Sequence, residues 1–264
     1  MVHGSKTISF LTKRSIVRLP EIKLFRRAIY VQEEIPVPNI SNKVGFRVCS
    51  PWPRPEAEVL AAFGNAASSQ VADSMSRIGA MDIGIKPIWP SPRIIGPALT
   101  VCCHSGDNLM LHQAISLALP GDILVVNTQG NVTNSPFGGL MASSAMKMGV
   151  KGVIVDGTVR DVESIQALAL PVYARGLCPN GCNKDGSGEV GTVIACGGVA
   201  IRPGDIIVAD RDGIAVVPLF DAAEVAKLSI AKVQSEEKRA AAIKSGVVTP
   251  PEIDEQLRRL NIIS

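Results

Sequence analysis

Residues 152–161 constrain the fold of this chain more than any other stretch of its length, and they read Gly152-Val-Ile-Val-Asp-Gly-Thr-Val-Arg-Asp161. The apolar run at 153–155 predicts a buried strand, and Asp156-Gly157 is a turn signal. A helical pattern then begins at Arg160 and Asp161. A strand that passes through a short turn into a helix is one β/α unit, so this segment favours an α/β fold.

Arg160 and Asp161 are also the strongest candidates for chemistry. A guanidinium binds a carboxylate through two parallel hydrogen bonds, and a neighbouring carboxylate is a hard oxygen ligand for Mg²⁺. Side by side at the start of a helix, the two side chains would hold both ends of a 2-oxo acid. The alternative is structural, because an acidic residue in the first turn of a helix stabilises it through the macrodipole, and such residues are common.

A glycine-containing loop lies upstream of this unit, at residues 134–145, and leads into an Ala- and Met-rich helix. Gly138 and Gly139 would let backbone N–H groups approach a ligand closely at the start of that helix, which favours anions. The alternative is that the two glycines only permit a tight loop and close helix packing. Together, the loop, helix, strand and Arg-Asp pair place two candidate anion-binding features on one β/α unit.

Further helices and strands are indicated on both sides of this unit. The pattern predicts helices at 56–63, 68–75, 107–119 and 222–244, and strands at 98–102, 123–127 and 171–175. A proline-rich crossover at 87–97 leads into the first of these strands. Residues 189–218 alternate Gly-rich turns with short β runs, and Asp210-Arg-Asp-Gly213 is typical of a hairpin turn. Periodicity alone therefore predicts a mixed α/β protein with a β-rich end.

Charge separates the start of the chain from the rest. Residues 1–50 contain nine Lys or Arg and three Glu, so this segment is +6 and the remainder is −3. A basic, acid-poor start is typical of a transit-like peptide, a binding arm or sequence upstream of the domain. We expect an N-terminal extension of low order at 1–43, one domain at 44–250 and a C-terminal tail at 251–264.

Composition limits the class of protein and its partners. With 46% hydrophobic and 19% charged residues, the chain can build a large core, and a net charge of +3 is too small to indicate nucleic-acid binding. No apolar run is long enough to span a membrane, and no signal peptide is convincing, so we expect no membrane partner. Six cysteines give no disulfide framework in a chain this long. A reduced, cytoplasmic protein is the expectation.

The cysteines raise one alternative metal site. Cys102-Cys103-His104 and the pair of Cys178 and Cys182 invite an interpretation as zinc ligands. Neither group has the spacing of a standard structural zinc site. Cys102 and Cys103 also end a predicted strand, where burial as small hydrophobic residues is favoured.

Seven short motifs in a fixed order resemble those of one known family. They are Gly96-Pro-Ala-Leu-Thr-Val101, Gly106-Asp-Asn108, Pro120-Gly-Asp-Ile-Leu-Val-Val126, Gly138-Gly-Leu140, the run 152–161, Pro171-Val-Tyr-Ala-Arg-Gly176 and the run 203–213. Over about residues 45 to 250, the chain resembles the RraA-like superfamily, which includes 4-hydroxy-4-methyl-2-oxoglutarate aldolase and 4-carboxy-4-hydroxy-2-oxoadipate aldolase. The resemblance implies a ββα sandwich of the swivelling phosphohistidine-domain type, assembled as a homotrimer or a dimer of trimers.

The resemblance also implies roles for individual residues. The aldolase signature is an Asp, twenty residues, and then Arg-Asp, which makes Arg160 the pyruvate-binding residue and Asp161 the ligand of Mg²⁺ or Mn²⁺. The loop of Phe137, Gly138, Gly139 and Leu140 would hold the pyruvate carboxylate through its backbone amides. The position of the signature's first Asp is occupied by Gly139 in this chain. Glycine has no group to move a proton.

A second acid is implied from a neighbouring subunit. In the family, a Glu on the C-terminal helix completes the site, and Glu236 fits this position best, beside Glu237 on the predicted helix at 222–244. The alternative is that both glutamates are solvated residues that pair with Lys or Arg one turn away. If Glu236 has the role that the resemblance implies, the site lies between two subunits, with Asp161 and the glycine loop from one chain and Glu236 from its neighbour.

These expectations converge on a metal-dependent lyase that acts on small 2-oxo acids. Positive charge at Arg160 and at a cation on Asp161 would stabilise a pyruvate enolate. The enolate forms by retro-aldol cleavage of a 4-hydroxy-2-oxo diacid or by decarboxylation of oxaloacetate, and only the first reaction needs a base for a hydroxyl proton. We expect Gly139 to limit cleavage more than decarboxylation. The alternative is a non-catalytic, protein-binding regulator of a ribonuclease.

Overall fold

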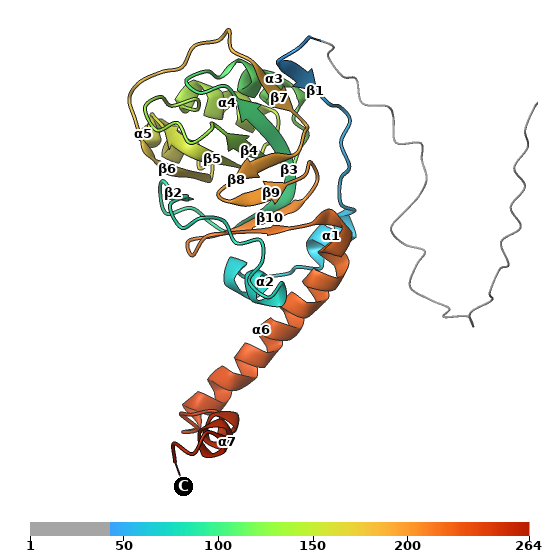
Figure 1. Cartoon of the computed structure of the whole chain (residues 1–264), viewed down its shortest axis with the longest axis vertical. Helices are drawn as coiled ribbons and strands as arrows, with labels where there is room; N and C mark the ends of the chain where they lie inside the picture. Colours follow the sequence, from blue (N-terminus) through green and yellow to red (C-terminus); the bar gives the residue numbers. More distant parts are fainter. Residues whose placement is uncertain (1–42, 264) are drawn as a thin grey trace, which may run out of the picture. The chain divides into compact units, whose positions relative to one another are not determined.

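Four parallel strands form the middle of the main sheet in the computed structural model, which describes residues 43–263 (Figure 1). They are β3 (Ile94–Cys103), β4 (Ile123–Asn127), β5 (Gly152–Val159) and β6 (Val172–Leu177), each paired with the next. The connecting helices are α3 (Leu109–Leu117), α4 (Gly139–Lys147) and α5 (Val162–Ala167). Parallel neighbours need a crossover connection, and here each crossover contains a helix. The predicted β/α units are therefore present.

Short strands extend the sheet on both sides. On one side β7 (Gly188–Val190) runs antiparallel to β3, and β1 (Phe46–Val48) pairs with β7. On the other side β2 (Lys86–Pro87) pairs with β6. The resulting order is β1-β7-β3-β4-β5-β6-β2.

A second β layer grows from the first half of β3. This half pairs with β10 (Ile206–Ala209), and β10 pairs with β11 (Ile214–Val217). The predicted hairpin turn joins these last two strands, and the N–H of Asp210 donates to the Gly213 carbonyl across 3.0 Å. A separate pair, β8 (Ile194–Cys196) and β9 (Val199–Ile201), completes the β-rich end.

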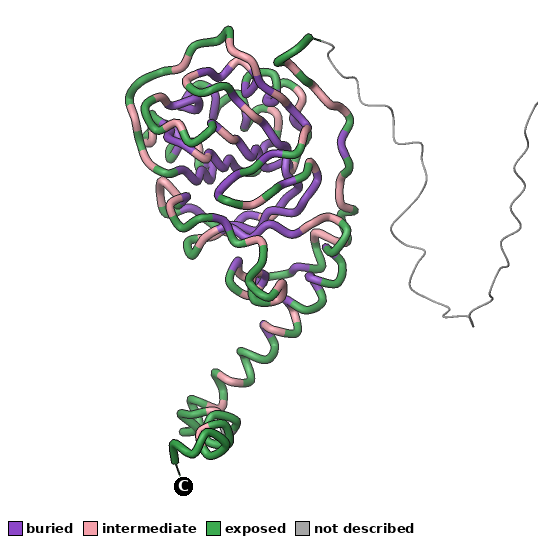
Figure 2. Tube along the Cα trace, viewed as in Figure 1, coloured by how far each residue is buried: buried purple, intermediate pink, exposed green. Residues whose placement is uncertain are grey.

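Alternation along the strands divides the core. In β4, Leu124 and Val126 pack toward α3, α4 and α5, whereas Ile123 and Val125 pack toward the second β layer. In β10, Ile207 joins the core between the β layers, and Val208 faces a third cluster. That cluster includes residues of α1 (Ala57–Ala61), α2 (Ser68–Ser74) and α6 (Ala222–Lys244). Figure 2 shows these buried segments in purple.

The expected fold type, a ββα sandwich of the swivelling phosphohistidine-domain type, is wrong. In the described residues the second β layer does not end the stack, because helices α1, α2 and α6 cover its outer face. Local patterns predicted the strands and helices, but pairing partners and layers depend on contacts between residues far apart in the chain.

The C-terminal region contains more helix than the predicted tail. After the short 3₁₀ helix η1 (Leu219–Asp221), α6 packs on α1 and α2, and Val233 is its last buried residue. Helix α7 (Pro251–Arg259) occupies part of the predicted tail. The predicted extension at 1–43 lies outside the described residues except for Lys43. None of the helices in the described part of the chain is long and apolar enough to cross a membrane.

Candidate active site

The predicted site residues lie where the parallel strands end. Loops leave the carboxyl ends of β3, β5 and β6 at residues 104–108, 160–161 and 178–187, and α4 begins beside them. We call this side of the sheet the carboxyl edge. In open α/β sheets, ligands bind in the crevice outside the carboxyl ends of the strands.

Asp161 stands at the start of α5 in a strained backbone conformation. It is the N-cap residue, with φ +60° and ψ +43°, a left-handed region that Asp tolerates better than most residues. Its Oδ2 accepts a hydrogen bond from the N–H of Gly139 across 3.0 Å and lies 3.7 Å from Nε of Arg160. The structure thus brings together the Arg-Asp pair and the glycine loop, as the sequence predicted.

Arg160 is held along one edge by the loop that follows β6. Its Nη1 lies 3.4 Å from the carbonyl oxygen of Pro179, to which it donates. A Cβ added to Gly181 would lie 2.9 Å from the same nitrogen, so a larger residue there would displace the end of the Arg160 side chain. The Arg160 side chain remains 43% exposed, which leaves part of the guanidinium open to a ligand.

Both glycines of the loop are required by close packing. A Cβ at Gly138 would lie 2.6 Å from Oδ2 of Asp161, and a Cβ at Gly139 would lie 2.9 Å from Cβ of Ser164. Real Cβ atoms do not approach other atoms so closely. Ser164 is not among the predicted site residues, although its position three residues after Asp161 on a predicted helix places it on the same side as that carboxylate.

The side chains of Phe137 and Leu140 have opposite environments. The Phe137 side chain is fully buried in the core against α3 and α4, so only its backbone serves the site. Its carbonyl accepts the N–H of Arg160 across 3.1 Å and fixes the exit of β5. Leu140, in contrast, is 88% exposed at the start of α4.

The amides of the glycine loop are not all available to a substrate. The N–H of Gly139 is already bonded to Asp161. The N–H groups of the next two residues, Leu140 and Met141, belong to the first turn of α4, where amides have no partner within the helix. These two amides are better placed to bind an anion at the positive end of the helix dipole.

Glu236 lies on α6 and makes its contacts within that helix and with α2. Its Oε2 accepts from Nε2 of Gln70 across 2.6 Å, and its Oε1 lies 3.8 Å from Nζ of Lys232. Within one chain it therefore does not join Arg160 and Asp161. Its contribution to a neighbouring subunit's site stays a prediction.

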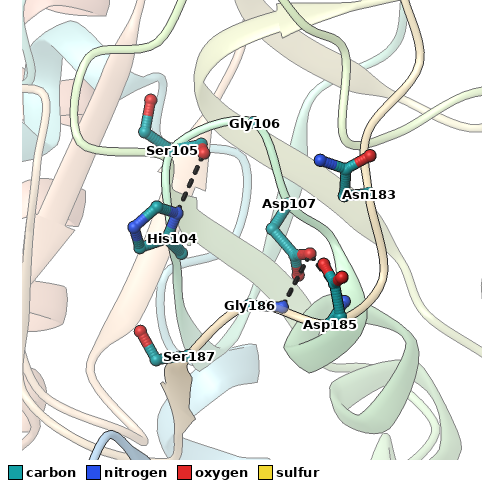
Figure 3. Close-up of a pocket in the computed structure, with 8 residues that line it drawn as sticks. All are labelled: His104, Ser105, Gly106, Asp107, Asn183, Asp185, Gly186 and Ser187. Carbon is teal, nitrogen blue, oxygen red and sulfur yellow. Dashed lines mark hydrogen bonds between the residues drawn. The ribbon is translucent and has the colours of Figure 1, made fainter.

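A polar pocket of about 320 Å³ opens at the same carboxyl edge, between residues 104–107 and 183–187 (Figure 3). Asp107 lines it but is saturated by the backbone, because its Oδ1 accepts from Leu109 N–H and its Oδ2 from the N–H groups of Asp185 and Gly186. Desolvation raises the pKa of Asp107, but these three bonds outweigh it and hold the pKa below the ordinary value. Asp107 is thus a structural carboxylate and a poor base.

The metal expectation can be tested against the donor groups present. In the described residues, no three His, Cys, Asp or Glu side chains come together in a way that could hold a metal ion. Mg²⁺ usually keeps several waters and binds through one or two carboxylates. Asp161, half exposed and anchored through one oxygen by Gly139, fits a hydrated ion of this kind. A closed, four-ligand zinc site does not fit.

Comparisons with known proteins agree on one family. The RraA-like family model (Aldolase/RraA) matches residues 68–216. A Halalkalibacterium halodurans protein named "Putative 4-hydroxy-4-methyl-2-oxoglutarate aldolase" is 34% identical over 193 residues, which cover 73% of this chain and 92% of that protein.

Solved structures indicate the same family. An uncharacterized protein from Pseudomonas syringae has a TM-score of 0.67 at 26% identity, over 74% of this chain and 96% of its own. RraAS2 from Streptomyces coelicolor, described as an unusual member of the RNase ES inhibitor RraA family, has a TM-score of 0.66 at 26% identity, over 72% of this chain and 99% of its own. These neighbours overturn the swivelling phosphohistidine-domain type. The chain belongs to the RraA-like family.

Proposed function

We propose that this protein is a divalent-metal-dependent lyase of small 2-oxo acids that forms the enolate of pyruvate. The observation that carries the proposal is the contact of Arg160, Asp161 and Gly139 at the carboxyl edge. A guanidinium, a carboxylate and the start of a helix meet there within one open site. The name of the Halalkalibacterium relative supports the same class of substrate.

Arg160 is proposed to bind and orient the 2-oxo acid. One edge of its guanidinium rests on the 179–181 loop, and the exposed remainder can donate two parallel hydrogen bonds to a carboxylate. The amides of Leu140 and Met141, which lie in the first turn of α4 where no partner within the helix is available, add donors at the positive end of α4. These groups neutralise the substrate's charge and hold it still beside Asp161.

Asp161 is proposed to hold the metal, Mg²⁺ or Mn²⁺. When bound, the cation supplies positive charge that stabilises an enolate oxygen. The left-handed backbone of Asp161 and the N–H of Gly139 fix the carboxylate before any ligand arrives. Strain of this kind is characteristic of functional sites, because the surrounding structure must maintain it.

Two reactions lead to the same enolate. In decarboxylation of oxaloacetate, the C3–C4 bond breaks, CO₂ leaves, and the electron pair remains on the pyruvate fragment, which then takes a proton at C3. In retro-aldol cleavage of a 4-hydroxy-2-oxo diacid, a base must also remove the C4 hydroxyl proton. Gly139 offers no base and Asp107 is saturated by backbone donors. Decarboxylation is therefore the reaction that the chain's own residues favour.

The test is release of pyruvate from oxaloacetate with and without added Mg²⁺ or Mn²⁺, with a chelator control and correction for the rate of the metal alone. Asp161→Asn removes the charge at the proposed ligand, and Glu163→Gln removes a charge two residues away on the same helix. We expect loss of metal-stimulated release in the first variant only. Equal rates in both variants and the wild type would refute the proposal.

The second candidate function is a non-catalytic regulator that binds a ribonuclease. The neighbour described within the RNase ES inhibitor RraA family favours it, as does the exposed Leu140 beside the site. A regulator has no need of Arg160 and Asp161. Inhibition of a ribonuclease that persists in Asp161→Asn, together with no turnover of any 2-oxo acid, would select this function.

A further inference from the structure

The strand that leads into the proposed active site contains a β-bulge. Val155 of β5 pairs with Ala174 of β6. The next pair along the two strands is Thr158 with Gly176, so two residues of β5 lie opposite a single residue of β6. Bulges are rare between parallel strands and are over-represented next to active sites, where they re-aim a side chain. This bulge lies in the strand that ends directly before Arg160.

The bulge consists of Asp156 and Gly157, and Arg175 is the residue opposite them. The Nε–H of Arg175 donates to Oδ1 of Asp156 across 2.5 Å. The N–H of Gly197, in the turn between β8 and β9, donates to Oδ2 of the same carboxylate across 2.7 Å. The Asp156 side chain is only 13% exposed. A largely buried ion pair therefore joins the two strands at the point where their register shifts.

The backbone of the bulge is fixed by the loop that follows β4. The Thr128 hydroxyl donates to the Asp156 carbonyl across 2.6 Å. A Cβ at Gly157 would lie 2.7 Å from the carbonyl oxygen of Asn131, so a larger residue would push against this loop. The sequence pattern predicted a turn at these two residues, whereas β5 continues to Val159, because these contacts keep the bulge within the strand.

The bulge sets the place at which β5 delivers the site residues. Directly after it, Val159 forms a bridge with Phe137, and the N–H of Arg160 donates to the Phe137 carbonyl across 3.1 Å. The Asp161 carboxylate then accepts from the N–H of Gly139. A regular pairing would shift the residues after the bulge by one step of about 3.3 Å along β6 and reverse the faces of their side chains. The contacts between the end of β5 and the glycine loop therefore depend on this offset.

We propose that Asp156 is a positioning residue, which specifies the bulge together with Arg175 and so holds Arg160 and Asp161 in their working orientation. The inference rests on the proposed function, and both residues of the pair act through the site residues rather than on the substrate. Buried ion pairs add little net stability compared with apolar packing, and their best-attested use is to specify register. The hydrogen bond from Arg175 to Asp156 is the largest cause that raises the pKa of Arg175, so Asp156 is its principal partner.

Arg175 has a second partner, which provides an internal control. Its Nη1 donates to Oδ1 of Asp82 across 3.1 Å. Asp82 lies before β2, outside the bulge, and its side chain is 50% exposed. Exposed ion pairs of this kind contribute little. Asp82→Asn therefore removes a charge from the same guanidinium and leaves the bulge intact.

The first measurement is the KM and kcat of pyruvate release from oxaloacetate at saturating Mg²⁺. Asp156→Asn places an NH₂ group against one of two donors, and Arg175→Lys keeps the charge but loses the Nε–H. We expect KM to rise about tenfold in both variants, because a small displacement of the binding groups is costly, and to stay at the wild-type value in Asp82→Asn. Asp122→Asn is the structural control, since Asp122 is also buried, is paired with Arg54 and lies just before β4. It should lower the folded fraction, and with it the apparent kcat, without a change in KM.

The second measurement does not depend on turnover. Hydrogen exchange, read by mass spectrometry in peptides that cover 137–140 and 159–161, reports the hydrogen bonds between the end of β5 and the glycine loop. We expect these peptides to exchange about tenfold faster in Asp156→Asn and Arg175→Lys, and at the wild-type rate in Asp82→Asn.

Unchanged KM and unchanged exchange in Asp156→Asn would overturn the inference and leave the proposed lyase function standing. Equal changes in Asp156→Asn and Asp122→Asn would also overturn it, because they would reflect lost stability alone. A wild type that releases no pyruvate would refute the proposed function, whereas faster exchange in the two bulge variants would still support the hold of the bulge on Arg160 and Asp161. If Asp156→Asn does not fold, Arg175→Lys, at a partly exposed side chain, decides the question.

Discussion

The N–H of Gly139 donates to the Asp161 carboxylate across 3.0 Å and so joins the first residue of α4 to the residue that caps α5. Two helices from different β/α units are tied together at the point where the proposed metal would bind. The contact depends on two local features, a glycine without a side chain and an aspartate with a positive φ.

Asp161→Asn should lose metal-stimulated turnover and keep its fold. Asn tolerates the left-handed conformation, and its amide oxygen can still accept the Gly139 N–H. Asp161→Ala loses both features and should be less stable by about 1–2 kcal/mol. Activity and thermal unfolding of the two variants, compared with Glu163→Gln, check this. An Asp161→Asn enzyme with normal metal stimulation would show that the ligand lies elsewhere.

Arg160→Lys should be impaired although the charge is kept. Lysine is a point charge and cannot provide the planar pair of donors, so one charged hydrogen bond to the substrate is lost. A loss of about 1.5–3 kcal/mol corresponds to a fall in kcat/KM of roughly tenfold to a hundredfold. Steady-state kinetics with oxaloacetate measure it, with Arg211→Lys as the matched control. If both variants match the wild type, Arg160 is structural.

Asp161 and Glu236 should act together only in an oligomer, because Glu236 contacts Gln70 and Lys232 within its own chain. We expect a trimer or dimer of trimers in which Glu236 serves the neighbouring site. Co-expressing Asp161→Asn with Glu236→Gln should restore part of the activity that each variant lacks alone, since some sites receive both native residues. Glu237→Gln is the control. A fully active monomer in sedimentation would contradict the shared site.

Gly139→Asp should raise aldol cleavage relative to decarboxylation, provided that the new side chain has room beside Ser164. The added Cβ would lie 2.9 Å from Cβ of Ser164, and overpacking of this kind costs about 1–3 kcal/mol. The double variant Gly139→Asp, Ser164→Gly removes the clash. We expect the single variant to be destabilised and the double variant to recover stability and show the lower ratio of decarboxylation to cleavage. An efficient wild-type aldolase that the acid does not improve would disprove the role assigned to Gly139.

Asp107→Asn should destabilise the carboxyl edge by about 2 kcal/mol at neutral pH, because one acceptor oxygen for three backbone donors is replaced by an NH₂ group. The pKa of Asp107 is lowered in the folded state, so its stabilising contribution is complete above the ordinary value of 3.8 and is lost as the pH falls through the folded pKa. The stability difference between wild type and variant should therefore shrink below pH 3.8. Urea unfolding from pH 7 to pH 3 measures it, and a constant difference would argue against the lowered pKa.

Sequence patterns predicted local structure better than contacts between distant segments. Strand 123–127 and helix 222–244 have their predicted bounds. The strand predicted at 98–102 begins earlier, at Ile94, because pairing with β10 extends it into the segment whose prolines indicated a crossover. Such pairing is not encoded in neighbouring residues, which is also why the fold type was wrong.

In the candidate site, too, local features were predicted and tertiary contacts were not. Arg160, Asp161 and the glycine loop could be predicted, because a strand, a turn and a helix place them at one edge of a parallel sheet. The positive φ of Asp161 and the bond that commits the Gly139 amide could not, since both result from tertiary packing. The burial of the Phe137 side chain in the core also results from tertiary packing.

The tight packing of Gly139 against Ser164 has a consequence for descent within the family. An acid at position 139 costs less stability when position 164 carries glycine, although that second change itself costs up to about 1 kcal/mol in a helix. The effect of either substitution therefore depends on the residue at the other position.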